Sequence, residues 1–309
     1  MTGFCKDFFS TFLYDTAQYA LDLNGCFFGS TVMKLAMVDD RLVSIDTLDP
    51  AYCDRGLYFG DGVYEVLRSY NGKIFALDEH MERFAASMAA IRITGIDIGT
   101  VRRRVEQAFQ IAGLPNAKIY FHVTRGSAPR NHTWDPSLRP NFFLTVSQAG
   151  DSQKEKTRGV AVCTYPDLRW KRCDIKSLNL LPNVLARQDA ADRGCDEAIL
   201  VDEAGFITEG AGSAFFAIIN RALQTAPLSA NILPSITRKF VVKAAQNVGM
   251  AIEESCLTPK RAAGADELFL AVTTKDIIPV VKFDGTTIGD GTPGPLTKAL
   301  TAEFLKFTL

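Results

Sequence analysis

The sequence predicts an α+β protein of two domains, each with mixed or antiparallel sheets and helices on the outside. β-type runs dominate both halves of the chain, and amphipathic helical segments occur among them. The chain has 309 residues, more than one small core accommodates. The polar stretch AGDSQKEKTRG at 149–159 is the expected linker. We therefore predict an N-terminal extension over 1–32, a small domain over 33–150 and a larger domain over 151–309.

The predicted extension is rich in aromatic residues but lacks the pattern of a secretory signal. Charged residues such as Lys6, Asp7 and Asp15 interrupt its apolar runs, so the continuous apolar stretch of a signal is missing. From Met33, the segment MKLAMVDDRLVSIDTLDP has two short apolar runs around DDR. This pattern predicts a hairpin at the start of the small domain.

Further along the small domain, a hairpin and two helices are expected. Asn71-Gly72 lies between two β-rich runs and is a strong turn signal, because both residues tolerate positive φ. Asp78 is the expected cap of a helix whose apolar residues, from Met81 to Ile91, fall three and four apart. A second helix is expected over 98–113, with strands over 118–124 and 141–148.

The larger domain is predicted to combine short strands with three helices. After the linker come a strand VAVCTY, a helix LPNVLARQDAADRG that ends at Gly194, and strands EAILVD and AFFAIIN. A helix over 236–250, the strands ELFLAVTT and IIPVVKFDG, and a closing helix over 295–307 complete the domain. The sequence has no internal repeat.

Composition excludes several classes of protein. Lys and Arg total 34 and Asp and Glu 35, for a net charge of −1, so the basic footprint of a nucleic-acid or membrane-surface protein is missing. No apolar run approaches the ~20 residues of a membrane span. The seven cysteines include no C-x-x-C pair, which favours free thiols in a reducing compartment and gives no zinc site. We expect a cytoplasmic protein.

One apparent nucleotide motif is best interpreted as a loop. Gly289, Gly291 and Gly294 match G-x-G-x-x-G, but a dinucleotide fold needs a further strand and an acidic residue about 20 residues on, and the sequence stops at Leu309. Pro293 and its neighbouring prolines favour a rigid turn before the last helix.

Four other segments could carry chemistry. Lys176 lies in the apolar run CDIKSLNLLPN, where a lysine needs a partner or serves as a nucleophile. TEGAGSAF, at 208–215, joins two strands with a carboxylate and two glycines, as either a tight turn or an anion-binding nest. PSITRKF, at 234–240, offers free N–H groups at a helix start, as either a plain cap or a phosphate site. RGSAPRNH, at 125–132, is either a solvated basic loop or a carboxylate trap.

Together these segments supply what a pyridoxal-phosphate enzyme needs: a Schiff-base lysine, a phosphate cradle, an acid for the pyridine nitrogen and a trap for a substrate carboxylate. The motifs DRGLYFGDGVYE, EHMER, RGSAPRNH, DIKSLNLLPNVLARQDA, ITEG and ITR also occur in the order found in fold-type IV pyridoxal-phosphate aminotransferases. The sequence resembles this family from about Met33 to its end. RGSAPRNH makes it most similar to the D-amino-acid aminotransferase branch.

The resemblance implies a role for each matching residue. Lys176 matches the catalytic Schiff-base lysine, and Glu209 matches the acid that pairs with the pyridine nitrogen. The implied cofactor is pyridoxal 5'-phosphate, and the implied substrates are a D-amino acid, such as D-alanine or D-glutamate, and a 2-oxo acid. A homodimer is implied as well, with the RGSAPRNH loop able to reach from a neighbouring chain. Other cofactor-binding positions are Arg83, Leu233, Ile236, Thr237 and Thr273, and the substrate carboxylate is assigned to Tyr64, Arg130 and His132.

Alternatives remain within the fold and outside it. A branched-chain L-aminotransferase, an (R)-amine transaminase and an aminodeoxychorismate lyase share the lysine and the phosphate cradle, but the pair Arg130 and His132 disfavours all three. A non-catalytic cofactor-binding module is disfavoured by the complete set Lys176, Glu209 and Arg83. The loop after Glu209 carries alanines and glycine where the family often has serine and asparagine, so fewer side-chain hydrogen bonds to the cofactor are expected.

Overall fold

The computed structural model describes residues 34–229 and 231–309, which fall into two units. The boundary between the units lies between Asp49 and Pro50. In the described part of the first unit, β1 (Leu35–Val38) and β2 (Arg41–Ser44) pair as an antiparallel hairpin and are followed by the 3-10 helix η1 (Ile45–Thr47). The hairpin predicted around DDR is confirmed. The extension predicted over 1–32 lies outside the described residues.

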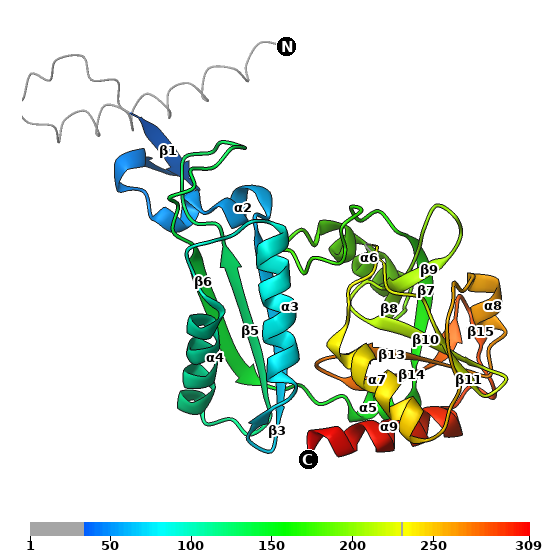
Figure 1. The fold of residues 1–309 in the computed structure, drawn as a ribbon. Helices are drawn as coiled ribbons and strands as arrows, with labels where there is room; N and C mark the ends of the chain where they lie inside the picture. Colours follow the sequence, from blue (N-terminus) through cyan, green and yellow to red (C-terminus); the bar gives the residue numbers. More distant parts are fainter. Residues whose placement is uncertain (1–33, 230) are drawn as a thin grey trace, which may run out of the picture. The chain divides into compact units, whose positions relative to one another are not determined.

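The N-terminal half of the second unit is a four-stranded antiparallel sheet in the order β4-β3-β5-β6, and two long helices cover one of its faces (Figure 1). Its core is apolar and includes Phe84 and Phe121. The elements are the 3-10 helix η2 (Pro50–Cys53), α2 (Arg55–Phe59), β3 (Gly62–Tyr70), β4 (Lys73–Ile74), α3 (Leu77–Ala90), α4 (Ile98–Ala112), β5 (Ala117–Thr124) and β6 (Asn141–Gln148).

Two local predictions in this half have different outcomes. The turn at Asn71 and Gly72 is confirmed, with φ of 49° and 84°. The cap assigned to Asp78 is wrong: α3 begins at Leu77, and its N-cap is Ala76, which makes no side-chain cap hydrogen bond. Asp78 lies in the first turn, where its carboxylate faces the positive end of the helix dipole and pairs with Arg102 at 2.5 Å.

The C-terminal half is built on a nine-stranded mixed sheet, which confirms the α+β prediction. Its order is β12-β11-β10-β13-β14-β7-β8-β9, with β15 beside β14. The pairs β14–β7, β7–β8 and β11–β12 are parallel, and the others are antiparallel. The strands are β7 (Val160–Pro166), β8 (Glu197–Val201), β9 (Ile207–Gly210), β10 (Ala214–Ile219), β11 (Ala222–Thr225), β12 (Ile252–Glu254), β13 (Glu267–Val272), β14 (Asp276–Phe283) and β15 (Thr286–Thr287).

Helices on both faces bury this sheet. The helices α7 (Ile236–Asn247) and α9 (Pro295–Leu305) pack on one face through residues such as Val241 and Leu300, and the short helix α8 (Pro259–Ala263) packs with the other core cluster. α6 (Leu181–Asp192) buries Ala186 and Ala190. The stretch predicted as a linker holds the short helix α5 (Gln153–Arg158). The 3-10 helix η3 (Lys306–Thr308) ends the chain.

The glycine-rich segment before α9 is a loop, as predicted. Gly289 and Gly291 have positive φ, and Gly294 is the N-cap of α9. The carboxylate of Glu267 accepts hydrogen bonds from the amides of Leu296 and Thr297, at 2.9 and 2.7 Å, so a side chain of the protein already occupies the anion position at the start of this helix.

No helix among the described residues is both long and apolar enough to cross a membrane.

Candidate active site

A cavity in the second unit is lined by segments far apart in the sequence. It lies beside the loop that follows β7, at the carboxyl end of a parallel strand pair, where α/β sheets commonly bind ligands. Residues from β3, α3, α6, β9, β10 and β13 also line it, together with residues just before α7 and just after β13. Six predicted site residues line it: Tyr64, Arg83, Lys176, Glu209, Leu233 and Thr273.

Lys176 is held at the cavity by its own backbone. Its carbonyl accepts a hydrogen bond from the amide of Tyr64 at 3.0 Å, and its amide donates to Ser87 Oγ at 3.2 Å. The neighbouring Ile175 is buried in the core of the small sheet. The amine Nζ lies 4.3 Å from the centre of the Tyr64 ring, and no ion pair of the described residues includes it. An amine set against an aromatic face and lining a cavity is well placed to act as a nucleophile.

Glu209 is a buried carboxylate that shares a guanidinium with a second acid. Arg169 donates to Glu209 through Nη1 and to Asp167 at 2.9 and 2.7 Å, and the Leu233 amide donates to Glu209 Oε1 at 3.2 Å. When both carboxylates are ionised, the two acids and the one guanidinium carry a net negative charge. Burial raises the pKa of Glu209, and the charge of Arg169 opposes that rise. The cluster is therefore suited to stabilise a cation inside the cavity.

At the other end of the lining, donors gather as they would around a phosphate. Arg83 is fixed by Glu65, which accepts from its Nε and Nη2, both at 2.7 Å. Ser235 caps α7 by accepting from the Arg238 amide at 3.1 Å. Among the contacts of the described residues, none uses the amides of Ile236 and Thr237, the first two of the helix. Thr237 Oγ1 lies 3.5 Å from Thr273 Oγ1.

Successive side chains of β3 point to opposite faces of the sheet, and two of the site's groups therefore lie on opposite sides of this strand. Tyr64 faces the cavity, whereas the next residue, Glu65, points to the opposite face of the sheet, toward α3. There His80 and Arg83, three residues apart on α3, both reach its carboxylate. β3 therefore provides both a side chain in the cavity wall, Tyr64, and the carboxylate that holds Arg83, Glu65.

Comparison with known proteins decides the family. The family model described as amino-transferase class IV matches residues 62–283. The chain belongs to this family. Among its relatives, it is 41% identical over 249 residues to a D-alanine aminotransferase of Bacillus licheniformis, covering 79% of this chain and 87% of the relative. It is 35% identical over 277 residues to a D-alanine aminotransferase of Staphylococcus haemolyticus, covering 89% and 98%.

Solved structures of the same fold include branched-chain enzymes. A branched-chain amino acid aminotransferase of Escherichia coli has a TM-score of 0.78 with 24% identity and covers 89% of this chain and 94% of that one. A branched-chain aminotransferase of Thermoproteus uzoniensis, solved with norvaline, has a TM-score of 0.75 with 25% identity, over 89% and 94%. These likenesses confirm the predicted fold of a class IV aminotransferase.

In this class IV aminotransferase, only one of the three residues predicted for the carboxylate trap lines the cavity, and His132 lines a neighbouring pocket that shares Trp170 with it. Tyr64 lines the cavity, but Arg130 and His132 do not. The Arg130 guanidinium lies 5.1 Å from the centre of the Phe59 ring, and the His132 ring lies 5.4 Å from the same ring. Arg125, the residue after β5, donates hydrogen bonds to Asp61 and does not line the cavity. The loop RGSAPRNH therefore places its two predicted substrate contacts at the surface of the same chain.

Sequence reasoning missed Arg169 and Glu65. Arg169 lies in LRWKRC, seven residues before Lys176, where three basic residues gave no reason to choose one. Its signal was the acid two residues earlier, Asp167, directly after the β7 strand. Glu65 lay inside the quoted motif GVYE, and a charged residue in an otherwise buried strand is itself a sign of a paired site.

Proposed function

We propose that this class IV aminotransferase uses pyridoxal 5'-phosphate to transfer an amino group between a D-amino acid, such as D-alanine or D-glutamate, and a 2-oxo acid, such as 2-oxoglutarate. The observation that carries the proposal is that Lys176, Glu209 and Arg83 line one cavity. The names of the relatives, D-alanine aminotransferases over most of the chain, support the D-amino-acid substrate.

The donors and acceptors of the cavity fit this cofactor. Arg83 is held by a carboxylate at its Nε and Nη2, which leaves Nη1 beside the start of α7, where it donates to the Pro234 carbonyl at 3.0 Å. With the amides of Ile236 and Thr237 and the Thr273 hydroxyl, it would hold the phosphate. Glu209 would face the ring nitrogen, and Lys176 Nζ would anchor the carbonyl carbon. Leu233 would contribute to the wall beside Glu209.

Each of these residues has one task in the proposed reaction. When bound, pyridoxal phosphate supplies an electron-accepting ring that stabilises negative charge at the α-carbon of the substrate. Glu209 holds a proton on the ring nitrogen, because its carboxylate favours a neighbouring cation. Lys176 Nζ would take the α-proton of the bound substrate and later return it as a general acid. Arg169 would favour the ionised form of Glu209 by donating to it.

We propose that the carboxylate trap is completed between two copies of the chain. Tyr64 lines the cavity of its own chain, while Arg130 and His132 are exposed and lie with Phe59. In a homodimer, the loop of one copy would supply a guanidinium and an imidazole to the cavity of the other. Light scattering tests this point, since a fully active monomer would contradict it.

Two further features accompany this function as proposals. A cytoplasmic location is supported by seven cysteines without a pairing pattern. The division into domains over 33–150 and 151–309 is supported by the separate sheets β3–β6 and β7–β15, although both sheets belong to the unit that begins at Pro50.

The proposal is tested by the absorbance change of the cofactor during one half-reaction. Purified enzyme loaded with pyridoxal phosphate is mixed with D-alanine, L-alanine, D-glutamate and L-leucine in turn. We expect conversion to the amine form with the two D-amino acids only. Conversion by L-leucine with no response to D-alanine would favour the branched-chain reaction of the structural neighbours.

A further inference from the structure

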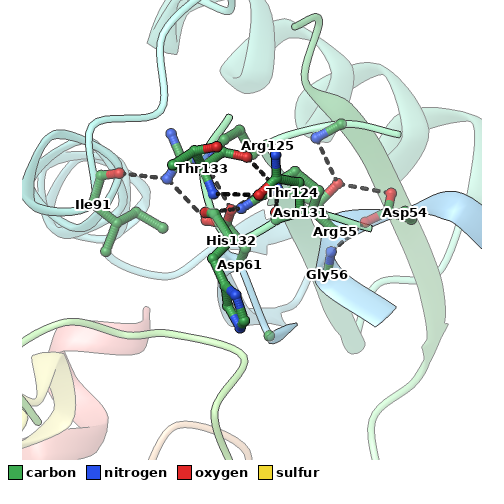
Figure 2. A network of polar contacts seen from close by, with 12 residues as sticks. Asp54, Arg55, Gly56, Asp61, Ile91, Thr124, Arg125, Asn131, His132 and Thr133 are labelled. Carbon is green, nitrogen blue, oxygen red and sulfur yellow. Dashed lines mark hydrogen bonds and ion pairs between the residues drawn. The ribbon is translucent and has the colours of Figure 1, made fainter. Parts of the chain in front are cut away.

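The loop that carries Arg130 and His132 is exposed but not loosely held. It connects β5 to β6, and the side chains of Arg130, Asn131, His132 and Thr133 are all exposed. Nevertheless, three consecutive carbonyls of this loop accept hydrogen bonds from one buried side chain, Arg55 (Figure 2). A surface loop with such an anchor is held in one backbone conformation.

Arg55 reaches the loop from α2, where it is 3% exposed. Its Nη1 donates to the carbonyls of Asn131 and Thr133, at 2.5 and 3.3 Å, and its Nη2 donates to the carbonyl of His132 at 3.2 Å. The planar fork of a guanidinium spans three acceptors at once, which the single nitrogen of a lysine does not.

Asp61 orients this guanidinium and ties it to the start of the loop. Its carboxylate accepts from Arg55 Nε at 2.8 Å and from Arg125 Nε and Nη2, both at 2.8 Å (Figure 2). Burial would raise the pKa of Asp61, but the hydrogen bonds from Arg125 and Arg55 lower it overall. Arg125 also donates to the carbonyls of Ile91 and Arg92, at 2.6 and 2.9 Å. The first residue of the loop and its middle therefore share one carboxylate.

Backbone hydrogen bonds and close packing also fix the start of the loop. The Arg55 amide donates to the Gly126 carbonyl at 2.9 Å, and the Arg125 amide donates to the Asp61 carbonyl at 3.0 Å. Gly126 has a φ of 116°, and a Cβ there would lie 2.2 Å from the Arg139 carbonyl oxygen. The Arg125 guanidinium lies 3.9 Å from the centre of the Trp134 ring. These contacts thus hold the residues at the start of the loop against those near its end.

We propose that Arg55, anchored by Asp61, is a positioning residue that sets the affinity for the substrate carboxylate by holding Arg130 and His132 in place. This inference rests on the proposed function, because it assigns the loop a substrate. Arg55 itself donates only to Asp61 and to loop carbonyls within the described contacts, so it acts through the loop. Its loss should weaken substrate binding rather than the chemical step.

The test uses Arg55→Lys, which keeps the charge and removes the fork. We expect KM for D-alanine to rise about tenfold with kcat within about twofold, because positioning contributes to binding through charge-assisted hydrogen bonds. In an Arg130→Ala background the same change should add less than about twofold, since the charged one of the two contacts that Arg55 positions is already gone. Two results would overturn the proposal. One is a KM in the double variant that rises by the product of the two single effects, and the other is a fall in kcat of Arg55→Lys as large as its rise in KM.

Matched variants separate positioning from folding. Arg102→Lys alters a guanidinium that pairs with Asp78 and Glu106 on the outside of α4, and it should leave KM unchanged. If Arg55→Lys fails to fold, Asp61→Asn takes its place. It keeps the three carbonyl contacts and weakens the hydrogen bonds that Asp61 accepts from Arg55 and Arg125, so a KM increase of about two- to fivefold is expected. An unchanged KM in Asp61→Asn would count against the proposal.

Hydrogen exchange tests the anchor independently of activity. Amides of the peptide 126–139 should exchange faster in Arg55→Lys than in wild type or Arg102→Lys, whatever the substrate of the enzyme. Unchanged exchange overturns the positioning role. If wild type converts no D-amino acid but exchange in Arg55→Lys is faster, the proposed function fails while the anchor stands.

Discussion

Replacing Glu65 by glutamine should destabilise the enzyme far more than its conservative size suggests. The carboxylate is fully buried and accepts three hydrogen bonds, two from Arg83 at 2.7 Å and one from His80 at 2.8 Å. Glutamine keeps one oxygen and turns an N–H group toward a donor of Arg83. A buried guanidinium without its counter-charge costs about 3–5 kcal/mol. We expect the free energy of unfolding to fall by that amount.

The pH dependence of this loss follows from the direction of the pKa shift. Although burial alone would raise it, Arg83 and His80 hold the pKa of Glu65 well below its ordinary value. The stabilisation is therefore present above the unfolded pKa of about 4.3 and is lost as pH falls toward the folded pKa. Burial lowers the pKa of His80, so the neutral ring donates from Nδ1 at neutral pH.

Urea unfolding followed by tryptophan fluorescence measures both effects. The difference between wild type and Glu65→Gln should be greatest at about pH 7 and shrink steadily below about pH 4.3, because Glu65 takes up a proton in the unfolded chain while the native carboxylate stays ionised to lower pH. Glu106→Gln is the matched control, because Glu106 forms an exposed pair with Arg102 at 3.1 Å and should change stability by less than about 1 kcal/mol. A difference for Glu65→Gln that is as small as the control, or independent of pH, would show that the buried carboxylate does not supply this stabilisation.

Three other outcomes are expected. Glu209→Gln should retain cofactor, measured by absorbance, yet lose turnover, because an amide does not hold the ring nitrogen protonated; unchanged turnover would remove the pairing. Arg130→Ala should lower kcat/KM for D-alanine by one to two decades, about 1.5–3 kcal/mol, with cofactor affinity unchanged; an indifferent variant would exclude Arg130 from the trap. A chain that starts at Met33 should keep full activity in the half-reaction assay, and a folded but inactive product would contradict this.

Features of the fold that depend on neighbours in sequence were predictable. The Asn71-Gly72 turn, the helix that begins at Ile236 and the strands of both halves follow from local φ preferences and periodicity. The Asp78 cap failed for a local reason, since Ala76 adopts the left-handed region and caps the helix two residues earlier. The residue at which the helix begins depends on the backbone conformation that follows the preceding strand, and residue propensity does not encode that conformation.

Parts of the site that depend on distant contacts were not predictable. Lys176, Glu209 and Arg83 were found through motifs, but their shared cavity is a property of the folded chain. Arg169 was missed because it looks like one of several basic residues until β9 brings Glu209 beside it. The orientation of the loop that carries Arg130 depends on Arg55, which is 75 residues away in the sequence and belongs to another motif.

The central claim is most directly tested by locating the cofactor attachment and asking which amino acid releases it. Holoenzyme is exposed briefly to D-alanine, to L-alanine or to neither, and is then reduced with borohydride, digested and mapped by mass spectrometry. We predict a reduced cofactor adduct on Lys176 that forms without amino acid and after L-alanine, but not after D-alanine. An adduct on another lysine, or equal removal by L-alanine, would contradict it.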